Sequence, residues 1–173
     1  MQLPEKLLQS LEGIEGFDKE AFEKVHAFGE QITSIRINPI RFWGSFTMAG
    51  GRAVPWTKLG YYLDSRPSFT FDPLFHAGCY YVQEASSMFI EQAFKQIIDF
   101  SQPLKVLDIC AAPGGKSTHI QSLISRDSLL VSNEVIRSRA NVLKDNIIKW
   151  GCENVIVTNN DPKDFTKLEN YFD

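Results

Sequence analysis

The stretch VLDICAAPGGKSTHI, residues 106–120, joins a short apolar run to a helix-forming sequence through a loop that contains Gly114 and Gly115. Glycine allows a tight turn and lets a ligand approach the backbone closely. The N-terminus of a following helix presents unpaired N–H groups and a partial positive charge, which favour an anionic group. The stretch therefore predicts a ligand-binding turn between a strand and a helix.

The string Gly115-Lys116-Ser117 resembles the end of the phosphate loop of ATPases and GTPases. That motif, G-x-x-x-x-G-K-[ST], requires glycine at position 110, where this sequence has Cys110, and Pro113 removes an N–H that such a loop uses. The next predicted strand ends on Asn133-Glu134 and not in an acidic metal-holding pattern. We therefore favour a Rossmann-type loop that binds an adenosine ligand.

Strand and helix patterns alternate along the chain after Pro103. A strand–helix–strand–helix–strand order is the first half, βαβαβ, of a doubly wound α/β domain with a parallel sheet. Three parallel strands leave one edge unpaired, so we expect this chain to be an N-terminal portion of a longer protein. The expected elements are strands over 104–110, 128–134 and 154–161 and helices over 117–125 and 138–150.

Two acidic residues follow the second and third strands of this pattern. Glu134 lies twenty residues after Gly114, where an acid accepts hydrogen bonds from ribose hydroxyls. Asp161 is placed to accept from an adenine amino group. Each residue alone also has a structural explanation, as a helix cap or a turn before proline. Together they predict a site for S-adenosylmethionine, whose methionine carboxylate takes the place of a phosphate.

The residues before the cofactor pattern predict a small α+β subdomain over 1–82, followed by the partial cofactor domain over 83–173. Residues 4–28 favour helix, with Asp18 as a cap and an apolar stripe of Phe22, Val25 and Phe28. Ile35 and Ile37 alternate with polar residues, which predicts a strand ended by Pro39. We expect short antiparallel strands over 43–81, with turns at Gly50-Gly51 and Asp72-Pro73, and a helix over 84–99.

Basic residues concentrate in residues 31–66 of a chain whose formal net charge is −3. This segment has five basic residues and one acid, which suits contact with RNA phosphates, although charge alone favours chance clustering on a solvated surface. The candidate RNA-binding residues are Arg36, Arg41, Arg52 and Lys58. Aromatic residues that would stack on bases, or else pack in the core, are Phe42, Trp43, Phe46, Trp56, Tyr61 and Tyr62.

Composition excludes several classes of protein. There is no apolar run long enough to span a membrane and no secretory signal at the N-terminus. Three scattered cysteines fit reduced thiols in a cytoplasmic protein, and no cluster has the spacing of a metal site. Nothing in the sequence predicts an oligomeric state.

The string DICAAPGGKSTHI (108–120) resembles the first cofactor motif of the NOL/NOP/Sun family of RNA cytosine-5 methyltransferases. Three further stretches are similar to family motifs in the same order, and TSIRINP resembles most the bacterial ribosomal-RNA (YebU-like) branch. These stretches are TSIRINP (33–39), YYVQEASSM (80–88) and NEVIRSRANVLKDNIIKWGCENVIVTNND (133–161).

The resemblance implies a Rossmann-like fold, S-adenosylmethionine as cofactor and RNA, most simply ribosomal RNA, as substrate. It assigns Glu134 to the ribose and Asp161 to the adenine. The methionine part of the cofactor would contact Cys110, Ala111, Ala112, Pro113, Gly114, Gly115 and Lys116. The residues that would pack and hydrogen-bond beneath this loop are Gln83, Glu84, Ser86 and Ser87.

The family's two catalytic cysteines lie in later motifs, which would fall after Asp173, so we expect no catalytic residue in this chain and no activity from it alone. One cysteine adds to cytosine carbon-6 and the other assists product release. Cys79, Cys110 and Cys152 do not match either motif. The alternative function is a noncatalytic RNA-binding or scaffold module that retains the methyltransferase fold.

Overall fold

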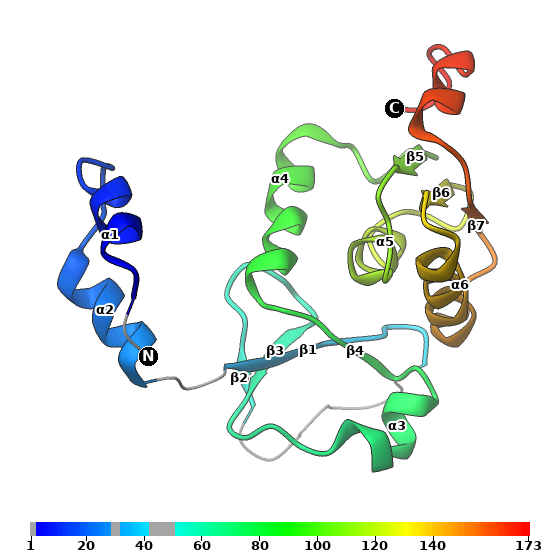
Figure 1. Ribbon diagram of the computed structural model, residues 1–173. Coiled ribbons are helices and arrows are strands. Elements are labelled where there is room, and N and C mark those ends of the chain that lie inside the picture. Colours follow the sequence, from blue (N-terminus) through cyan, green and yellow to red (C-terminus); the bar gives the residue numbers. More distant parts are fainter. Residues whose placement is uncertain (1–2, 29–31, 42–50) are drawn as a thin grey trace. The chain divides into compact units, whose positions relative to one another are not determined.

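The computed structural model describes residues 3–28, 32–41 and 51–173, and its chain divides into two units, Met1–Ile32 and Thr33–Asp173 (Figure 1). Within the described ranges, no helix is long and apolar enough to cross a membrane. The antiparallel strands and the cofactor half of the chain fall in one unit, so the division into domains at 82/83 stays a prediction.

The first unit consists of α1 (Glu5–Leu11) and α2 (Lys19–Phe28). Gly13 and Gly16, both at positive φ, lie in the turn between these helices. The Asp18 side chain accepts a hydrogen bond from the Ala21 N–H at 3.0 Å, which confirms the predicted helix cap. Val25, expected on an apolar stripe, is 71% exposed in this unit.

An antiparallel sheet begins the second unit, in the strand order β2-β3-β1-β4. Its strands are β1 (Thr33–Ile37), β2 (Arg52–Ala53), β3 (Gly60–Leu63) and β4 (Tyr80–Val82). At the expected Asp72-Pro73 turn a short helix begins, α3 (Pro73–His76), and Asp72 caps it by accepting from the Leu74 N–H at 2.8 Å. The short antiparallel strands expected in this region are therefore present, while Gly50 of the expected Gly50-Gly51 turn lies outside the described residues.

The predicted βαβαβ order is confirmed in the rest of the unit. Three parallel strands pair in the order β5-β6-β7, and each crossover between them is a helix. Asp173 lies beside the edge strand β5 and exchanges hydrogen bonds with Lys105. The elements are β5 (Lys105–Asp108), α5 (Gly115–Gln121), β6 (Leu129–Asn133), α6 (Arg137–Trp150) and β7 (Val155–Thr158).

Helices α5 and α6 lie between the two sheets, so the second unit has three layers (Figure 1). The expected helix over 84–99 is a 3-10 turn, η2 (Ser86–Phe89), that continues into α4 (Ile90–Ile97). Met88 and Leu143, both fully buried, belong to two different core clusters of this unit. This order of layers places the antiparallel sheet next to α5, the helix that begins at the end of the loop over 110–116, and next to α6.

Strand β1 is buried on both faces, which differs from the alternation that the sequence suggested. Ile35 and Ile37 belong to the core beside Tyr80, but Arg36 and Asn38 are also completely buried. Asn38 donates from Nδ2 to the carbonyls of Gly78 and Trp150, both at 2.9 Å. The polar face of the strand therefore contacts the helix layer and not solvent.

Candidate cofactor-binding site

The loop over 110–116 follows the carboxyl end of β5 and is held by hydrogen bonds to its carbonyl oxygens. Asn146 Nδ2 and the Tyr81 hydroxyl donate to the Pro113 carbonyl at 2.8 and 3.1 Å. Gly114 has φ +111 and serves as the N-cap of α5, a conformation that side-chain-bearing residues rarely adopt. The loop is thus fixed by side chains from β4 and α6.

Asn133, the last residue of β6, joins all three strand ends. Its Nδ2 donates to the Ile109 and Asn160 carbonyls at 3.2 and 3.0 Å. Its Oδ1 accepts from the Thr158 hydroxyl and the Asn160 N–H, both at 2.9 Å. The side chain is fully buried, and all of its hydrogen-bonding groups have partners. Since these partners belong to the segments after β5 and β7, Asn133 holds the segments after the three strands side by side.

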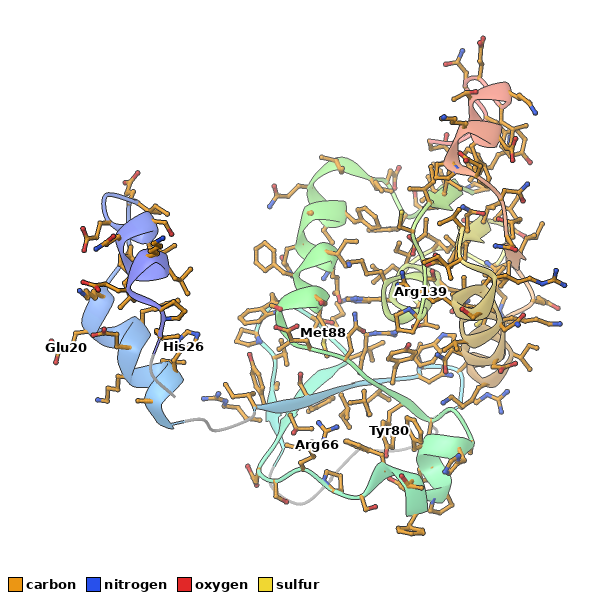
Figure 2. All side chains as sticks on the ribbon, in the orientation of Figure 1. Glu20, His26, Arg66, Tyr80, Met88 and Arg139 are labelled. Atoms are coloured by element: carbon orange, nitrogen blue, oxygen red, sulfur yellow. The ribbon has the colours of Figure 1, made fainter. Side chains whose placement is uncertain are left out.

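Glu134 follows Asn133 and is 3% exposed. Its Oε1 accepts from the Ile136 N–H at 3.0 Å, and its Oε2 lies 3.6 Å from Nη1 of Arg139. Nη2 of the same arginine donates to the Ala112 carbonyl at 3.0 Å. Arg139, at the start of α6 and labelled in Figure 2, therefore bridges the Glu134 carboxylate and the loop after β5. Each carboxylate oxygen has a second lone pair, so Glu134 keeps the capacity to accept from a ligand.

Asp161 lies past the end of β7, and its neighbour Asn160 is bonded to Asn133 as described above. The side chain is exposed and accepts from the Lys163 N–H at 2.9 Å, which makes it the cap of the 3-10 turn η3 (Pro162–Lys167). The structure therefore brings the loop, Glu134 and the Asp161 segment to one edge of the parallel sheet. The cofactor contacts of these residues remain predictions.

A pocket of about 220 Å³ separates the loop over 110–116 from residues 81–87. Gln83 is buried and lines it, together with Glu84, Ser87 and Lys116. The Ser86 hydroxyl donates to Glu84 on the exposed side, at 2.8 Å. Four residues were predicted to lie beneath the loop. Of these, Gln83 is buried, and its side chain accepts a hydrogen bond from Arg36 of the antiparallel sheet.

Arg36 corrects the prediction of RNA binding, because its side chain is 0% exposed. Its Nη2 donates to the Thr118 hydroxyl at 2.6 Å and to the Gly115 carbonyl at 3.4 Å, and the guanidinium lies 4.5 Å above the Trp150 ring. Burial lowers the pKa of Arg36 to about 9, and the side chain stays charged at neutral pH. A group held in this way joins the antiparallel sheet to α5 and α6 and does not reach a phosphate.

The other basic candidates are exposed at the surface of the antiparallel sheet and its loops. Arg41 donates from Nε to the Trp150 carbonyl at 3.2 Å, and Arg52 lies 5.0 Å above the Tyr62 ring. Lys58 is exposed as well. Trp56 donates to the Ala85 carbonyl at 2.7 Å and is partly buried, while Phe42, Trp43 and Phe46 lie outside the described residues.

Family comparisons divide the chain into two matching regions. Residues 3–85 match the N-terminal domain of 16S rRNA methyltransferase RsmF, and residues 96–173 match 16S rRNA methyltransferase RsmB/F. The chain belongs to the RsmB/F family of 16S rRNA methyltransferases. This result confirms the resemblance to the bacterial ribosomal-RNA branch.

Curated relatives in the RsmB/F family match most of this chain but extend well beyond the matched part. Ribosomal RNA small subunit methyltransferase F of Shewanella loihica is 33% identical over 144 residues, which are 78% of this chain and 30% of the relative. The Shewanella denitrificans protein is 35% identical over 151 residues, 79% of this chain and 29% of the relative. The chain thus spans less than a third of the length of these relatives.

Solved structures agree on the fold. A methyltransferase homologue from Pyrococcus horikoshii is 26% identical with a TM-score of 0.72, and the match covers 99% of this chain and 61% of that one. NSun6 from the same organism, solved with SFG, has a TM-score of 0.74 at 14% identity, and the match covers 95% of this chain and 67% of the NSun6 chain. The predicted partial Rossmann-like methyltransferase fold is therefore confirmed.

Three residues that hold the site of this RsmB/F chain together were not predicted from the sequence: Asn133, Arg139 and Asn146. A signal was present for Asn133, because a polar residue at the end of a strand that begins with an apolar run needs a buried partner. Arg139 and Asn146 lie on an amphipathic helix, where charged and polar residues usually face solvent, so their spacing gave no indication of contact with the loop.

Proposed function

We propose that this chain forms part of an S-adenosylmethionine-dependent enzyme that methylates carbon-5 of cytosine in ribosomal RNA. The observation that carries the proposal is the meeting of the loop over 110–116, Glu134 and the Asp161 segment at one sheet edge, through Asn133. Carboxyl ends of parallel strands are where ligands bind in open α/β sheets. Membership of the RsmB/F family supports both the RNA substrate and the transfer of a methyl group.

In this proposal, the loop over 110–116 contacts the methionine part of the cofactor, Glu134 accepts from the ribose hydroxyls and Asp161 accepts from the adenine amino group. Support comes from the buried, ion-paired position of Glu134 and from the NSun6 relative in fold, which was solved with SFG, an S-adenosylmethionine analogue. When bound, the cofactor supplies an electrophilic methyl group. The chain's own residues bind and orient it.

The methyl transfer itself needs a nucleophile that this chain does not provide. Burial raises the pKa of the Cys152 thiol to about 11, which disfavours the reactive thiolate, and Cys79 is buried among aromatic side chains. Cys110 is exposed on the cofactor loop, where it would contact the cofactor and not the base. We therefore assign no catalytic residue within 1–173 and expect no methylation from this chain alone.

The test uses the protein expressed from the complete open reading frame that encodes this chain. Small-subunit ribosomal RNA is incubated with S-adenosylmethionine that carries a labelled methyl group, and the digested nucleosides are analysed by mass spectrometry. We expect labelled 5-methylcytidine with the wild-type protein and none with Gly115→Asp, which places a carboxylate between the loop and the side chains of Tyr81 and Gln83. Labelling of a different nucleoside would refute the cytosine assignment, and no labelling together with no cofactor binding would refute the proposal.

A further inference from the structure

The pocket between residues 81–87 and the loop over 110–116 contains a buried hydrogen-bond donor without a partner. Gln83 is 7% exposed, and its Nε2 has no hydrogen-bond partner among the described residues. Buried side-chain amides are normally paired, because a lost hydrogen bond to water is not otherwise replaced. A donor left in this state at the wall of a pocket points to an acceptor that comes from outside the chain.

Arg36 fixes which end of the Gln83 amide faces the pocket. Arg36 Nε can only donate, and it lies 2.8 Å from the Gln83 side chain, so the atom that it meets must be Oε1. The opposite end of the amide, Nε2, then lies toward Gly115: a Cβ built on that glycine would be 3.8 Å from it. The donor therefore lies against the cofactor loop.

The backbone of Gln83 is held as firmly as its side chain. Its N–H donates to the Ser34 carbonyl at 3.2 Å, and its carbonyl accepts from the Ser34 hydroxyl at 2.6 Å. With the backbone tied to β1 and the amide oxygen tied to Arg36, the side chain has no freedom to turn its donor elsewhere. The antiparallel sheet thus presents the Nε2 amino group, with its two N–H donors, to the cofactor loop in a defined direction.

The charges around the pocket favour an acceptor that is anionic or carries partial negative charge. Lys116 lines the pocket, and the buried guanidinium of Arg36 lies directly behind Gln83. Glu84 is the acidic residue of the lining, and its Oε1 accepts from Ser86 on the exposed side. Ser87, also in the lining, adds a hydroxyl that either donates or accepts.

We propose that Gln83, oriented by Arg36, donates a hydrogen bond from Nε2 to an acceptor oxygen of the ligand bound against the loop over 110–116. This inference rests on the proposed function and deepens it by assigning a contact residue outside the Rossmann half of the chain. The acceptor oxygen has two possible sources: the methionine carboxylate of the cofactor, or an oxygen of the substrate nucleotide.

The decisive variant is Gln83→Glu in the protein expressed from the complete open reading frame. The substitution keeps an acceptor for Arg36 and gives that buried cation a carboxylate partner, but it replaces the donor at the pocket with a negatively charged oxygen. We expect a melting temperature equal to or above that of the wild-type protein. If Gln83→Glu lowers the melting temperature, the affinities are compared at a temperature at which both proteins remain folded.

Titration calorimetry with two ligands identifies the source of the oxygen. S-adenosylhomocysteine carries the carboxylate, whereas 5′-methylthioadenosine lacks it. If the carboxylate is the partner, Gln83→Glu lowers the affinity for S-adenosylhomocysteine at least tenfold and leaves the affinity for 5′-methylthioadenosine unchanged. If the partner is a nucleotide oxygen, both cofactor analogues bind as in wild type and binding of ribosomal RNA weakens at least tenfold.

Ser122→Ala is the matched control, because Ser122 also accepts from Arg36, at 3.4 Å, but does not line the pocket. It should leave all three affinities unchanged. The inference is overturned, while the proposed function stands, if Gln83→Glu binds both analogues and ribosomal RNA as tightly as the wild-type protein. An equal loss of affinity for both analogues overturns it as well. A wild-type protein that binds neither analogue overturns the proposed function, and this inference with it.

Discussion

The Thr158 hydroxyl donates to Oδ1 of Asn133 at 2.9 Å, and this bond joins the ends of two neighbouring parallel strands. The same Asn133 side chain also reaches the segment after β5 through the Ile109 carbonyl. Strand pairing alone aligns the three strands, but it does not determine where the chain goes after each strand ends. The Asn133 amide provides that alignment for the segments that carry the candidate cofactor residues.

Asn133→Ala should lower the free energy of unfolding by roughly 3 kcal/mol, because it removes four hydrogen bonds, three of them to backbone groups of Ile109 and Asn160. Thr158→Val is the matched control: it removes one of these bonds and should cost about 1 kcal/mol. Urea unfolding followed by circular dichroism measures both. Equal losses in the two variants would contradict the role of Asn133 as the common partner of the strand ends.

Gly78→Ala should destabilise the second unit more than Gly151→Ala, although both glycines have positive φ. A Cβ at Gly78 would lie 2.1 Å from the Lys149 carbonyl oxygen, a backbone atom at the end of α6. At Gly151 the nearest atom is the flexible end of the Arg41 side chain, which can move away. We expect about 1 kcal/mol for Gly151→Ala from the backbone conformation alone and roughly 3 kcal/mol for Gly78→Ala.

Thermal unfolding of the two glycine variants at one pH provides this comparison. A Gly78→Ala protein as stable as Gly151→Ala would mean that the turn before β4 does not pack closely against α6. The result matters for the site, because Asn38 bonds to both Gly78 and Trp150 and so ties the same contact to strand β1.

Acid should destabilise the fold through His119, which is 1% exposed and bonds to Glu91 at 3.1 Å. Burial, together with the positive charge of Arg36, lowers the pKa of His119 to about 4, from about 6.5 in an unfolded chain. Protons therefore bind the unfolded chain first, and stability should fall as pH decreases from about 6.5 to 4, by roughly 3 kcal/mol. His119→Gln should flatten the curve of stability against pH over this window.

Glu91 adds to the loss at the lower end of the same range. Burial alone would raise its pKa, but hydrogen bonds from Lys95, Thr57 and His119 outweigh that effect and lower it. The stabilisation from its ionised form is therefore present above pH 4.5 and disappears as pH falls further. Urea unfolding at half-unit pH steps checks both groups, and a wild-type curve that is flat between pH 6.5 and 4.5 would contradict the assignment to His119.

The sequence alone predicted the βαβαβ order, because an apolar run, a glycine turn and an amphipathic helix follow each other with little ambiguity. The turn at Gly114 and the end of the expected 138–150 helix, directly before Gly151, were predictable because glycine readily adopts positive φ, and both glycines have positive φ in the structure. The role of Arg36 was not predictable. Its place in an alternating strand is typical of a solvent-facing side chain, and its partners, Gln83 and Thr118, are distant in sequence.

The basic surface that remains after the correction of Arg36 gives a prediction for RNA binding. Arg52→Ala combined with Lys58→Ala should weaken binding of ribosomal RNA and lower the slope of log K against log salt concentration by about 1.5, since each neutralised phosphate contributes about 0.7 to 0.9. The control is Lys167→Ala, because Lys167 is exposed and lies outside residues 31–66. This substitution should leave the slope unchanged. An unchanged slope in the double variant would show that these residues do not contact phosphates.

The three cysteines should react with iodoacetamide in an order that their surroundings determine. Cys110 is exposed on the cofactor loop, Cys79 is buried, and burial raises the pKa of the Cys152 thiol to about 11. Since the thiolate is the reacting form, Cys110 should be alkylated at least tenfold faster than Cys152 at pH 8. Peptide mass spectrometry after timed quenching measures the rates, and unfolding in urea should bring them close together.

S-adenosylhomocysteine should slow the alkylation of Cys110 in the protein expressed from the complete open reading frame, because the proposed site places the ligand against residues 110–116. The rate at Cys152 is the internal control, since that residue lies past the end of α6 and not on the loop. Slowing at Cys110 alone would locate the ligand at the loop. Equal slowing at both cysteines would indicate general stabilisation, and a ligand that binds without slowing Cys110 would mean that the loop does not form the contact assigned to it.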